Sequence, residues 1–236
     1  PKGKDFDFGA GIVLARTRSG RDIVLAGQKS GHVYALAPDD GTLIWEQRIG
    51  EGTALGGVHW GMGRPEGALY ARHNGTTFPA GSQAPALFAK LLGGRTPMPG
   101  LYRLDIETGE LVWEWQVARN CLPNFQSEST WPLCPRQIGL SGAILSVEGA
   151  IFSTALDGTW RAHRVNDGSV IREESTMRPY VKTLNGVPGH GGSMDNATLV
   201  AAGDMLYVQS GYGFFGGTPG NVLIAYELAE DDVNED

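Results

Sequence analysis

Hydrophobic and polar residues alternate with a period of two along most of the chain, in short runs that end at glycine-containing turns. Three stretches share this pattern: GHVYALAPDDGTLIW at 31–45, GLYRLDIETGELVW at 100–113 and GTWRAHRVNDGSVIR at 158–172. In each, a polar residue and a glycine separate two apolar runs, at Asp40-Gly41, Thr108-Gly109 and Asp167-Gly168. Glycine adopts the positive φ that such a tight turn needs, so each stretch is predicted to be a β-hairpin.

Two more apolar runs precede each hairpin and complete a four-stranded unit. The nearer runs are 22–26, 68–71 and 150–155, and the more distant runs are 11–15, 55–60 and 138–147. A fourth, degenerate unit has runs at 198–201, 205–209 and 221–227. Repeated four-stranded antiparallel units predict an all-β chain of propeller blades, expected at 10–48, 55–117, 138–175 and 197–228.

Two features complicate this pattern. The stretch 63–99 is expected to be a loop insert, and helical periodicity is found only inside it, at 84–92. Four blades lie at the low end of the range in which propellers close, so the ring is expected to be partial, as part of an eight-bladed one. A β-sandwich is the alternative architecture, but the repeat argues against it.

Composition supports a folded domain that does not bind nucleic acid. The chain has 236 residues, of which 41% are hydrophobic, 19% are charged and 35 are glycine. Six of the 26 acidic residues lie in the last ten positions, so the rest of the chain, with its 19 basic residues, is nearly neutral. The residues 229–236 are expected to be a solvated acidic tail. A neutral body lacks the basic face that nucleic acid requires, and no apolar run has the length of a membrane span.

The cysteines and the first residue bear on the cellular compartment. Cys121 and Cys134 lie in one polar stretch and would close a small disulfide loop in an oxidising compartment. Neither belongs to a haem-attachment or zinc motif. The sequence starts at Pro1 without a leader, so either a leader was removed or this is a piece of a longer chain.

The hairpin with Asp-Gly and Leu-Ile-Trp resembles the repeat of pyrroloquinoline quinone (PQQ) propellers, in which a tryptophan docks one blade onto the next. Trp45 and Trp113 have this position, whereas the third unit has Arg172. The stretches AGQKSGHVYAL at 26–36, ALDGTWRAH at 155–163 and 203–228 resemble quinoprotein alcohol dehydrogenases. DFDFG at 5–9 and GGVHWGM at 56–62 resemble their poly(vinyl alcohol)-oxidising branch.

This resemblance implies roles for individual residues. Asp5 corresponds to the family's general base and calcium ligand, and Asp7 is the alternative two residues further on. Lys29 corresponds to the cation beside the quinone carbonyls. His59, next to Trp60, occupies the place of an asparagine whose amide contacts PQQ, and Leu140 replaces a tryptophan. The family's glycine-rich loop at the cofactor rim corresponds to Gly211, Tyr212 and Gly213.

The chemistry of alcohol oxidation agrees with these roles. The reaction removes a proton from oxygen and a hydride from carbon, so it needs a base and an electrophile that gains charge. Asp5 would be the base, while Lys29 and calcium would stabilise the charge on the quinone. Without the resemblance, Asp5 and Lys29 would be read as solvated turn residues, and His59 with Trp60 as part of a core.

The resemblance therefore implies a periplasmic PQQ- and calcium-dependent enzyme that oxidises alcohols, such as secondary alcohols or poly(vinyl alcohol), and passes electrons to a cytochrome. The chain would be its C-terminal portion, inactive alone, with any haem c in the missing part or in a partner. The alternative is a non-catalytic propeller that binds proteins, as outer-membrane assembly propellers do. Such scaffolds lack the Asp and Lys pair, which distinguishes the two functions.

Overall fold

The computed structural model describes residues 6–50, 52, 56–64, 67–74, 99–117, 139–213 and 217–228. All of the regular secondary structure in these ranges is β-strand, which confirms the predicted all-β class. The expected roles of Asp5, the cysteine pair, the helical pattern at 84–92 and the tail at 229–236 concern residues outside these ranges. No described segment forms a helix long and apolar enough to cross a membrane.

The strands form four antiparallel sheets, each a meander of consecutive strands, which we call blades 1 to 4. Blade 1 contains β1 (Val13–Arg16), β2 (Asp22–Gly27), β3 (His32–Leu36) and β4 (Leu43–Arg48). Blade 2 contains β5 (Ala68–His73), β6 (Gly100–Asp105) and β7 (Leu111–Gln116). Blade 3 contains β8 (Leu145–Val147), β9 (Ala150–Thr154), β10 (Thr159–Arg164) and β11 (Val170–Ser175). Blade 4 contains β14 (Leu199–Ala202), β15 (Met205–Ser210) and β16 (Val222–Glu227).

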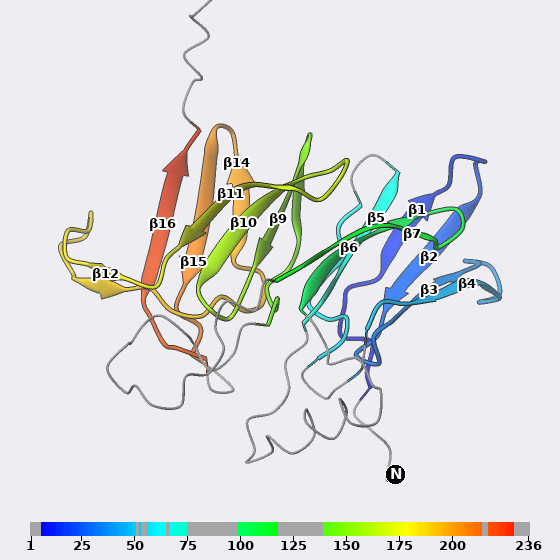
Figure 1. Cartoon of the computed structure of the whole chain (residues 1–236), viewed down its shortest axis with the longest axis horizontal. Helices are drawn as coiled ribbons and strands as arrows, with labels where there is room; N and C mark the ends of the chain where they lie inside the picture. The colour runs from blue at the N-terminus through cyan, green and yellow to red at the C-terminus, as the bar shows by residue number, and fades with distance from the viewer. Residues whose placement is uncertain are drawn as a thin grey trace, which may run out of the picture.

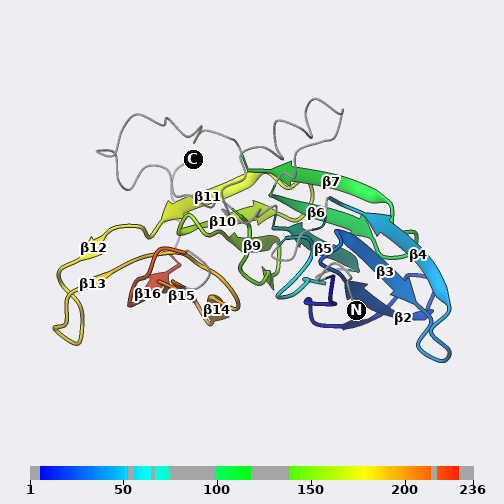
Figure 2. The same cartoon turned by 90° about the horizontal axis from the view of Figure 1, so that it is seen from below.

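The blades follow one another along an arc, as Figures 1 and 2 show. In Figure 2, β4, β7 and β11 lie on the outer side of this arc. A small separate hairpin, β12 (Pro179–Tyr180) with β13 (Gly189–His190), lies between blades 3 and 4 in the chain. The radial succession of sheets is the arrangement that the sequence repeat predicted.

The three predicted hairpins are β3–β4, β6–β7 and β10–β11. The pairing register of each shifts at the same place, between residues 35 and 36, 103 and 104, and 162 and 163. A β-bulge of this kind increases the local twist of a strand pair. The repeat in the sequence is therefore also a repeat in backbone geometry.

The expectation of a loop insert over all of 63–99 needs correction. Gly63 pairs with Tyr70 in the place of the missing inner strand of blade 2, and β5 follows it directly. Every residue of β5 is buried, because its alternating side chains face the two neighbouring blades. Residues 75–98 lie outside the described ranges.

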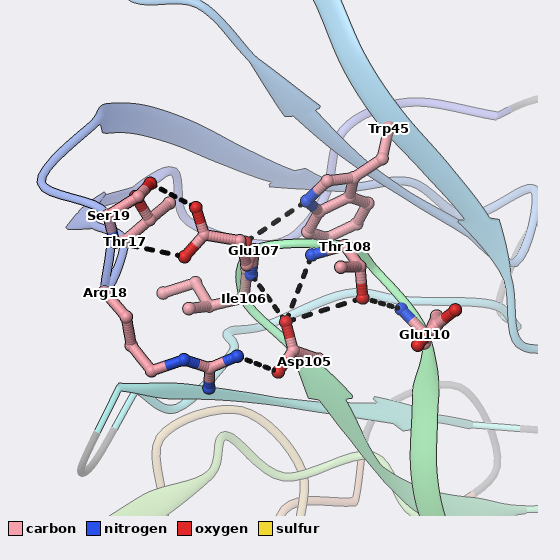
Figure 3. Close-up of polar contacts among 9 residues, drawn as sticks. All are labelled: Thr17, Arg18, Ser19, Trp45, Asp105, Ile106, Glu107, Thr108 and Glu110. Atoms are coloured by element: carbon pink, nitrogen blue, oxygen red, sulfur yellow. Dashed lines mark hydrogen bonds and ion pairs between the residues drawn. The ribbon is translucent and has the colours of Figure 1, made fainter.

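Tryptophans dock successive blades, as the resemblance implied. The indole N–H of Trp45 on β4 donates to the carbonyl of Ile106, 3.2 Å away (Figure 3). The Trp45 ring also lies against Gly109 of the next blade. Trp113 on β7 repeats this contact, with a 3.1 Å hydrogen bond to Val165. Arg172 on β11 instead lies over the ring of Trp160 in its own blade, at 6.0 Å. The third unit therefore lacks this docking contact.

Polar contacts accompany the docking of Trp45 (Figure 3). The Arg18 guanidinium in the turn between β1 and β2 lies 2.7 Å from the carboxylate of Asp105 at the end of β6. The second carboxylate oxygen of Asp105 accepts from the backbone N–H groups of Glu107 and Thr108 and so caps the turn. The hydroxyl of Ser19 donates to Glu107. These contacts hold the β1–β2 turn of blade 1 against the β6–β7 turn of blade 2, at the strand ends where the β3–β4 turn also lies.

The hydrophobic core is divided among the spaces between successive blades. Blades 1 and 2 share a cluster that contains Leu25, Val33, Leu69 and Leu104. Blades 2 and 3 share Tyr70, Leu101, Ile151 and Val165, and blades 3 and 4 share Trp160, Met194, Leu199 and Val208. Each blade is therefore stabilised by its neighbours, and removing apolar contact at one seam weakens two sheets.

Candidate functional site

Polar side chains from every blade lie at one end of the strands, which we call the hub edge of the four sheets. In an antiparallel meander, the end of the second strand and the start of the first strand lie at the same edge. Lys29 follows β2, Asn74 follows β5, and His59, Ser141 and Asp195 precede the inner strands of blades 2, 3 and 4. We call these five residues the hub cluster. Parallel bridges from Gly9 to His59 and from Gly142 to Asn196 join neighbouring blades at this edge.

Lys29 is held by Asp7. Its ammonium Nζ lies 2.9 Å from the Asp7 Oδ1, and its backbone N–H donates to the Asp7 carbonyl at 3.0 Å. The Lys29 side chain is 15% exposed, whereas that of Asp7 is 58% exposed. Gly57 has a φ of +75°, and a Cβ there would collide with the Lys29 backbone, so only glycine fits. Asp7, the alternative to Asp5, is thus placed beside the predicted cation, while Asp5 lies outside the described residues.

His59 is buried at the centre of the hub cluster, with 6% of its surface exposed. Its Nε2 lies 3.0 Å from the amide nitrogen of Asn74 and 3.4 Å from the hydroxyl of Ser141. Burial lowers the pKa of His59 to about 3, and the nearby positive charges of Arg72 and Lys29 add to this effect. The imidazole is therefore neutral at pH 7.

The hydrogen bonds continue from His59 into blades 3 and 4. The Ser141 hydroxyl donates to the Asp195 carboxylate at 2.5 Å, and Ser141 also lies 3.4 Å from the Asn74 amide nitrogen. The pattern of the sequence did not reveal Asn74, Ser141 or Asp195, because no motif contains them. The only available signal was their shared position next to strand ends on one edge.

Arg72, at the end of β5, supports this site from behind. It is fully buried, and its guanidinium donates to the carbonyl of His59 at 2.6 Å and to the carbonyl of Leu140. Burial lowers the pKa of Arg72 to about 9, and the charge of Asp195 opposes this change. Arg72 therefore fixes the backbone of two residues, from blades 2 and 3, that the resemblance places at the cofactor.

Trp60, which follows His59, has a backbone conformation that non-glycine residues rarely adopt. Its φ is +66°, the residue is 41% exposed, and its ring centroid lies 5.5 Å from that of His59. The backbone N–H of Trp60 donates to the carbonyl of Gly9 at 2.9 Å. Positive φ at a bulky residue costs free energy and is concentrated at functional sites. The exposed indole is available to a ligand, in contrast to the core position that was the alternative.

The glycine-rich loop is joined to the hub cluster through blade 4. The N–H groups of Gly211 and Tyr212 both donate to the carbonyl of Ser193, at 3.1 and 2.9 Å. Ser193 precedes Asp195 by two residues, and Tyr212 is 44% exposed. Gly211 has a φ of +130°, and Gly213 packs against Pro219. The loop thus contacts the segment of Asp195, and these contacts do not include Lys29 or His59.

The donors at this edge suit an anionic, carbonyl-rich cofactor such as PQQ. Lys29 supplies a cation, and His59 supplies a neutral imidazole whose Nδ1 makes no hydrogen bond within the described ranges. Calcium takes six or more oxygen ligands, and its proposed ligand Asp5 lies outside the described residues. Among the described residues, no three His, Cys, Asp or Glu side chains form a metal cluster.

Comparison with known proteins agrees with this fold. A chain of Sphingopyxis sp. (strain 113P3) named polyvinylalcohol dehydrogenase is 36% identical over 238 residues, covering 97% of this chain and 34% of the relative. A Pseudomonas sp. protein of the same name is 34% identical over 235 residues, covering 96% of this chain and 33% of the relative. The chain therefore spans about one third of the length of these relatives.

Solved structures show the same fold at low sequence identity. A europium-containing methanol dehydrogenase matches with a TM-score of 0.57 at 14% identity, over 92% of this chain and 41% of that one. The quinohemoprotein alcohol dehydrogenase ADHIIG from Pseudomonas putida HK5 matches with a TM-score of 0.57 at 14% identity, over 99% and 41%. BamB from Moraxella catarrhalis matches with a TM-score of 0.50 at 13% identity, over 93% and 47%.

A sequence model of a protein family also matches most of the chain. The PQQ_2 model, described as "Outer membrane protein assembly factor BamB", matches residues 29–233. This range contains all three hairpins and most of the hub edge, and the match agrees with the repeat that the sequence pattern revealed. The chain therefore belongs to the PQQ_2 family of PQQ-type repeat propellers.

Proposed function

We propose that this chain forms part of a PQQ-dependent dehydrogenase that oxidises alcohols. The observation that carries the proposal is the 36% identity to polyvinylalcohol dehydrogenase over nearly the whole chain. Lys29 and a neutral His59 at one edge of the blades support it, because both can donate to a quinone. Secondary alcohols, as in poly(vinyl alcohol), are the proposed substrates.

The residues of the chain would act by binding and by charge. When bound, PQQ would accept the two electrons that leave the alcohol carbon as the carbonyl forms. The Lys29 ammonium would stabilise negative charge at a cofactor oxygen. A carboxylate is needed to take the hydroxyl proton, and Asp5 remains the proposed base, with Asp7 as the alternative. Asp7 is ion-paired with Lys29, so the proton acceptor and the cation would lie side by side.

Ser141 and Asp195 would keep the buried edge polar without adding net positive charge. The negative charge of the Asp195 carboxylate stabilises the charged form of the buried Arg72 guanidinium and so offsets part of the cost of burying that charge. Arg72 in turn holds the carbonyls of His59 and Leu140 in place. This arrangement would pre-position the His59 ring before any ligand arrives.

The remaining parts of the proposal come from the resemblance. They are a calcium ion with Asp5 as a ligand, reoxidation of the cofactor by a cytochrome, and a periplasmic location. Trp60, Gly211, Tyr212 and Gly213 are proposed cofactor contacts. The exposed Trp60 and Tyr212 rings support this role, because an aromatic face stacks on a planar ligand.

Binding of PQQ and turnover test this proposal separately. We expect PQQ to quench the tryptophan fluorescence of the chain, and Lys29→Gln to weaken binding about tenfold, as the loss of one charge-assisted hydrogen bond predicts. Lys182→Gln is the matched control, since Lys182 is exposed in the β12–β13 hairpin. The full-length protein that contains this chain, loaded with PQQ and Ca²⁺, should then reduce a dye with secondary alcohols.

The same experiments address the scaffold alternative. A protein-binding propeller would show neither PQQ-dependent quenching nor dye reduction with any alcohol. Equal PQQ affinity of the Lys29→Gln and Lys182→Gln variants would remove Lys29 from the site. Full activity of an Asp5→Asn variant, combined with loss of activity in Asp7→Asn, would transfer the role of base to Asp7.

A further inference from the structure

Asn74 lies where the hydrogen bonds of the hub cluster converge. It directly follows β5, is 2% exposed, and contacts His59 of its own blade and Ser141 of the next blade. The direction of each hydrogen bond in this group follows from one fixed end, the carboxylate of Asp195. The protonation of His59 is determined by that direction.

The fixed end is the contact between Ser141 and Asp195. An ionised carboxylate only accepts hydrogen bonds, and a serine hydroxyl has one hydrogen to donate. At 2.5 Å, this hydrogen is used in the bond to Asp195. Any further bond to the Ser141 hydroxyl oxygen must therefore be donated by the other partner. Two nitrogens lie 3.4 Å from this oxygen, the amide nitrogen of Asn74 and the Nε2 of His59, and they lie 3.0 Å from each other. Two donors do not face each other at that distance, and only the NH₂ group has two hydrogens, so it can donate to both the oxygen and Nε2.

That other partner is the side chain of Asn74. Because the Ser141 oxygen can only accept here, the Asn74 group that lies 3.4 Å away must be the amide nitrogen and not the amide oxygen. The network thus settles the orientation of the amide, which heavy-atom positions alone leave ambiguous. The NH₂ group has a second hydrogen, and the Nε2 of His59 lies 3.0 Å from the same nitrogen.

The second hydrogen determines the state of the imidazole. A ring nitrogen that accepts a hydrogen bond carries no proton, so the single proton of neutral His59 must be on Nδ1. The positive charges of Arg72 and Lys29 act against the doubly protonated ring, while Ser141 stands between the ring and Asp195. Within the described ranges Nδ1 has no acceptor, so its N–H is available to a ligand.

We propose that Asn74 is a positioning residue that keeps His59 in the tautomer protonated on Nδ1 and so presents Nδ1–H to a carbonyl or carboxylate oxygen of the bound cofactor. The tautomer follows from the hydrogen bonds of this chain alone, whereas the identity of the acceptor rests on the proposed function. In this role His59 offers an N–H donor, as would the amide of the asparagine that it replaces in the resemblance.

The tautomer is measured directly by NMR on the chain labelled with ¹⁵N-histidine, without PQQ. Long-range ¹H–¹⁵N spectra distinguish protonated from unprotonated ring nitrogens, and the His59 signals among the five histidines are assigned by their loss in His59→Gln. We expect an unprotonated Nε2 and a protonated Nδ1 from pH 5 to pH 8. A protonated Nε2 in the unmodified chain would overturn the proposal, and this measurement requires no variant at position 74.

Asn74→Asp tests the role of Asn74 with a side chain of the same shape. An aspartate carboxylate cannot donate, so the favourable arrangement becomes Nε2–H donating to residue 74, and the protonated nitrogen should change. Asn185→Asp is the matched control, because it makes the same change in the exposed β12–β13 hairpin, where the Asn185 side-chain oxygen only accepts, and it should leave the tautomer unchanged. Identical nitrogen shifts in Asn74→Asp and in the unmodified chain would show that Asn74 does not set the tautomer.

A titration with PQQ separates this inference from the proposed function. Asn74→Asp should weaken PQQ binding about tenfold, and the control Asn185→Asp should change it by no more than about twofold. If the tautomer is as expected and PQQ does not bind the unmodified chain, the positioning role stands and the proposed cofactor is wrong. If PQQ binds and Asn74→Asp binds it equally well, His59 does not present its N–H to the cofactor.

Discussion

Three glycines at one position of the repeat provide a controlled test of blade docking. Gly41, Gly109 and Gly168 occupy the hairpin turns with nearly equal φ values of +74°, +76° and +72°. A Cβ on Gly109 would lie 2.6 Å from the ring of Trp45, and one on Gly168 would lie 2.6 Å from the ring of Trp113. A Cβ on Gly41 would meet nothing within 4 Å. The three sites therefore differ mainly in the presence of the tryptophan.

The magnitudes follow from two separate effects. A non-glycine residue in the left-handed region costs about 1 kcal/mol, and this cost is common to all three sites. At Gly109 the Trp45 ring must also move, which adds about 1–3 kcal/mol for overpacking and weakens the indole hydrogen bond to Ile106. We expect Gly41→Ala to lower the free energy of unfolding by about 1 kcal/mol, and Gly109→Ala by about 3 kcal/mol.

Urea and thermal unfolding, followed by circular dichroism, measure this difference. For a chain of this size, 1 kcal/mol corresponds to about 2–4 °C in Tm, so the two variants should differ by roughly 4–8 °C. In a Trp45→Ala background, Gly109→Ala should cost no more than Gly41→Ala, because the obstacle is absent. Equal destabilisation by Gly41→Ala and Gly109→Ala in the unmodified chain would refute the docking argument.

Three further predictions concern buried polar groups. Burial lowers the pKa of His163 to about 4 from 6.5 in the unfolded chain, so the unfolded state binds the extra proton and stability falls as the pH decreases from about 6.5 to 4. His163→Gln should remove about 2 kcal/mol of the stability difference between pH 7 and pH 5, and an unchanged difference in urea titrations would contradict this. Arg72→Met removes the guanidinium that donates to two buried carbonyls, including that of His59. It should lower the free energy of unfolding in urea by about 2–4 kcal/mol, and a loss below about 1 kcal/mol would show that these hydrogen bonds contribute little. Tyr70→Phe removes the 3.0 Å hydrogen bond to the Val165 carbonyl, which still accepts from other donors, so a loss of only about 0.5–1 kcal/mol is expected by the same assay.

Much of the fold was predictable because its information is local in sequence. Alternation with period two defines a strand wherever it occurs, and a glycine between two such runs defines the turn. The hairpins around Gly41, Gly109 and Gly168 therefore formed as predicted. The expected loop at 63–99 was partly wrong, because it overlapped the strand run predicted at 68–71; that run is β5, which is buried along its whole length, and Gly63 pairs with Tyr70 beside it.

The candidate site was predictable only where a resemblance supplied a motif. Lys29, His59 and Trp60 were recognised from short stretches that resemble the family. Asn74 and Arg72 were missed, since a polar residue after a strand has no distinctive pattern. The pairing of Lys29 with Asp7 depends on a backbone contact between the chain start and the β2–β3 turn, which the spacing of the residues does not reveal.

The sequence by itself determined the strands and their turns, because each depends on residues close together in the repeat, whereas the docking role of the tryptophans came from the resemblance. Only the tertiary structure decided which polar groups meet at the hub edge. Asn74 and Ser141 are 67 residues apart, and Ser141 and Asp195 are 54 residues apart. Radial stacking brings such residues together, and the direction of hydrogen bonding that fixes the His59 proton exists only once three blades have packed side by side.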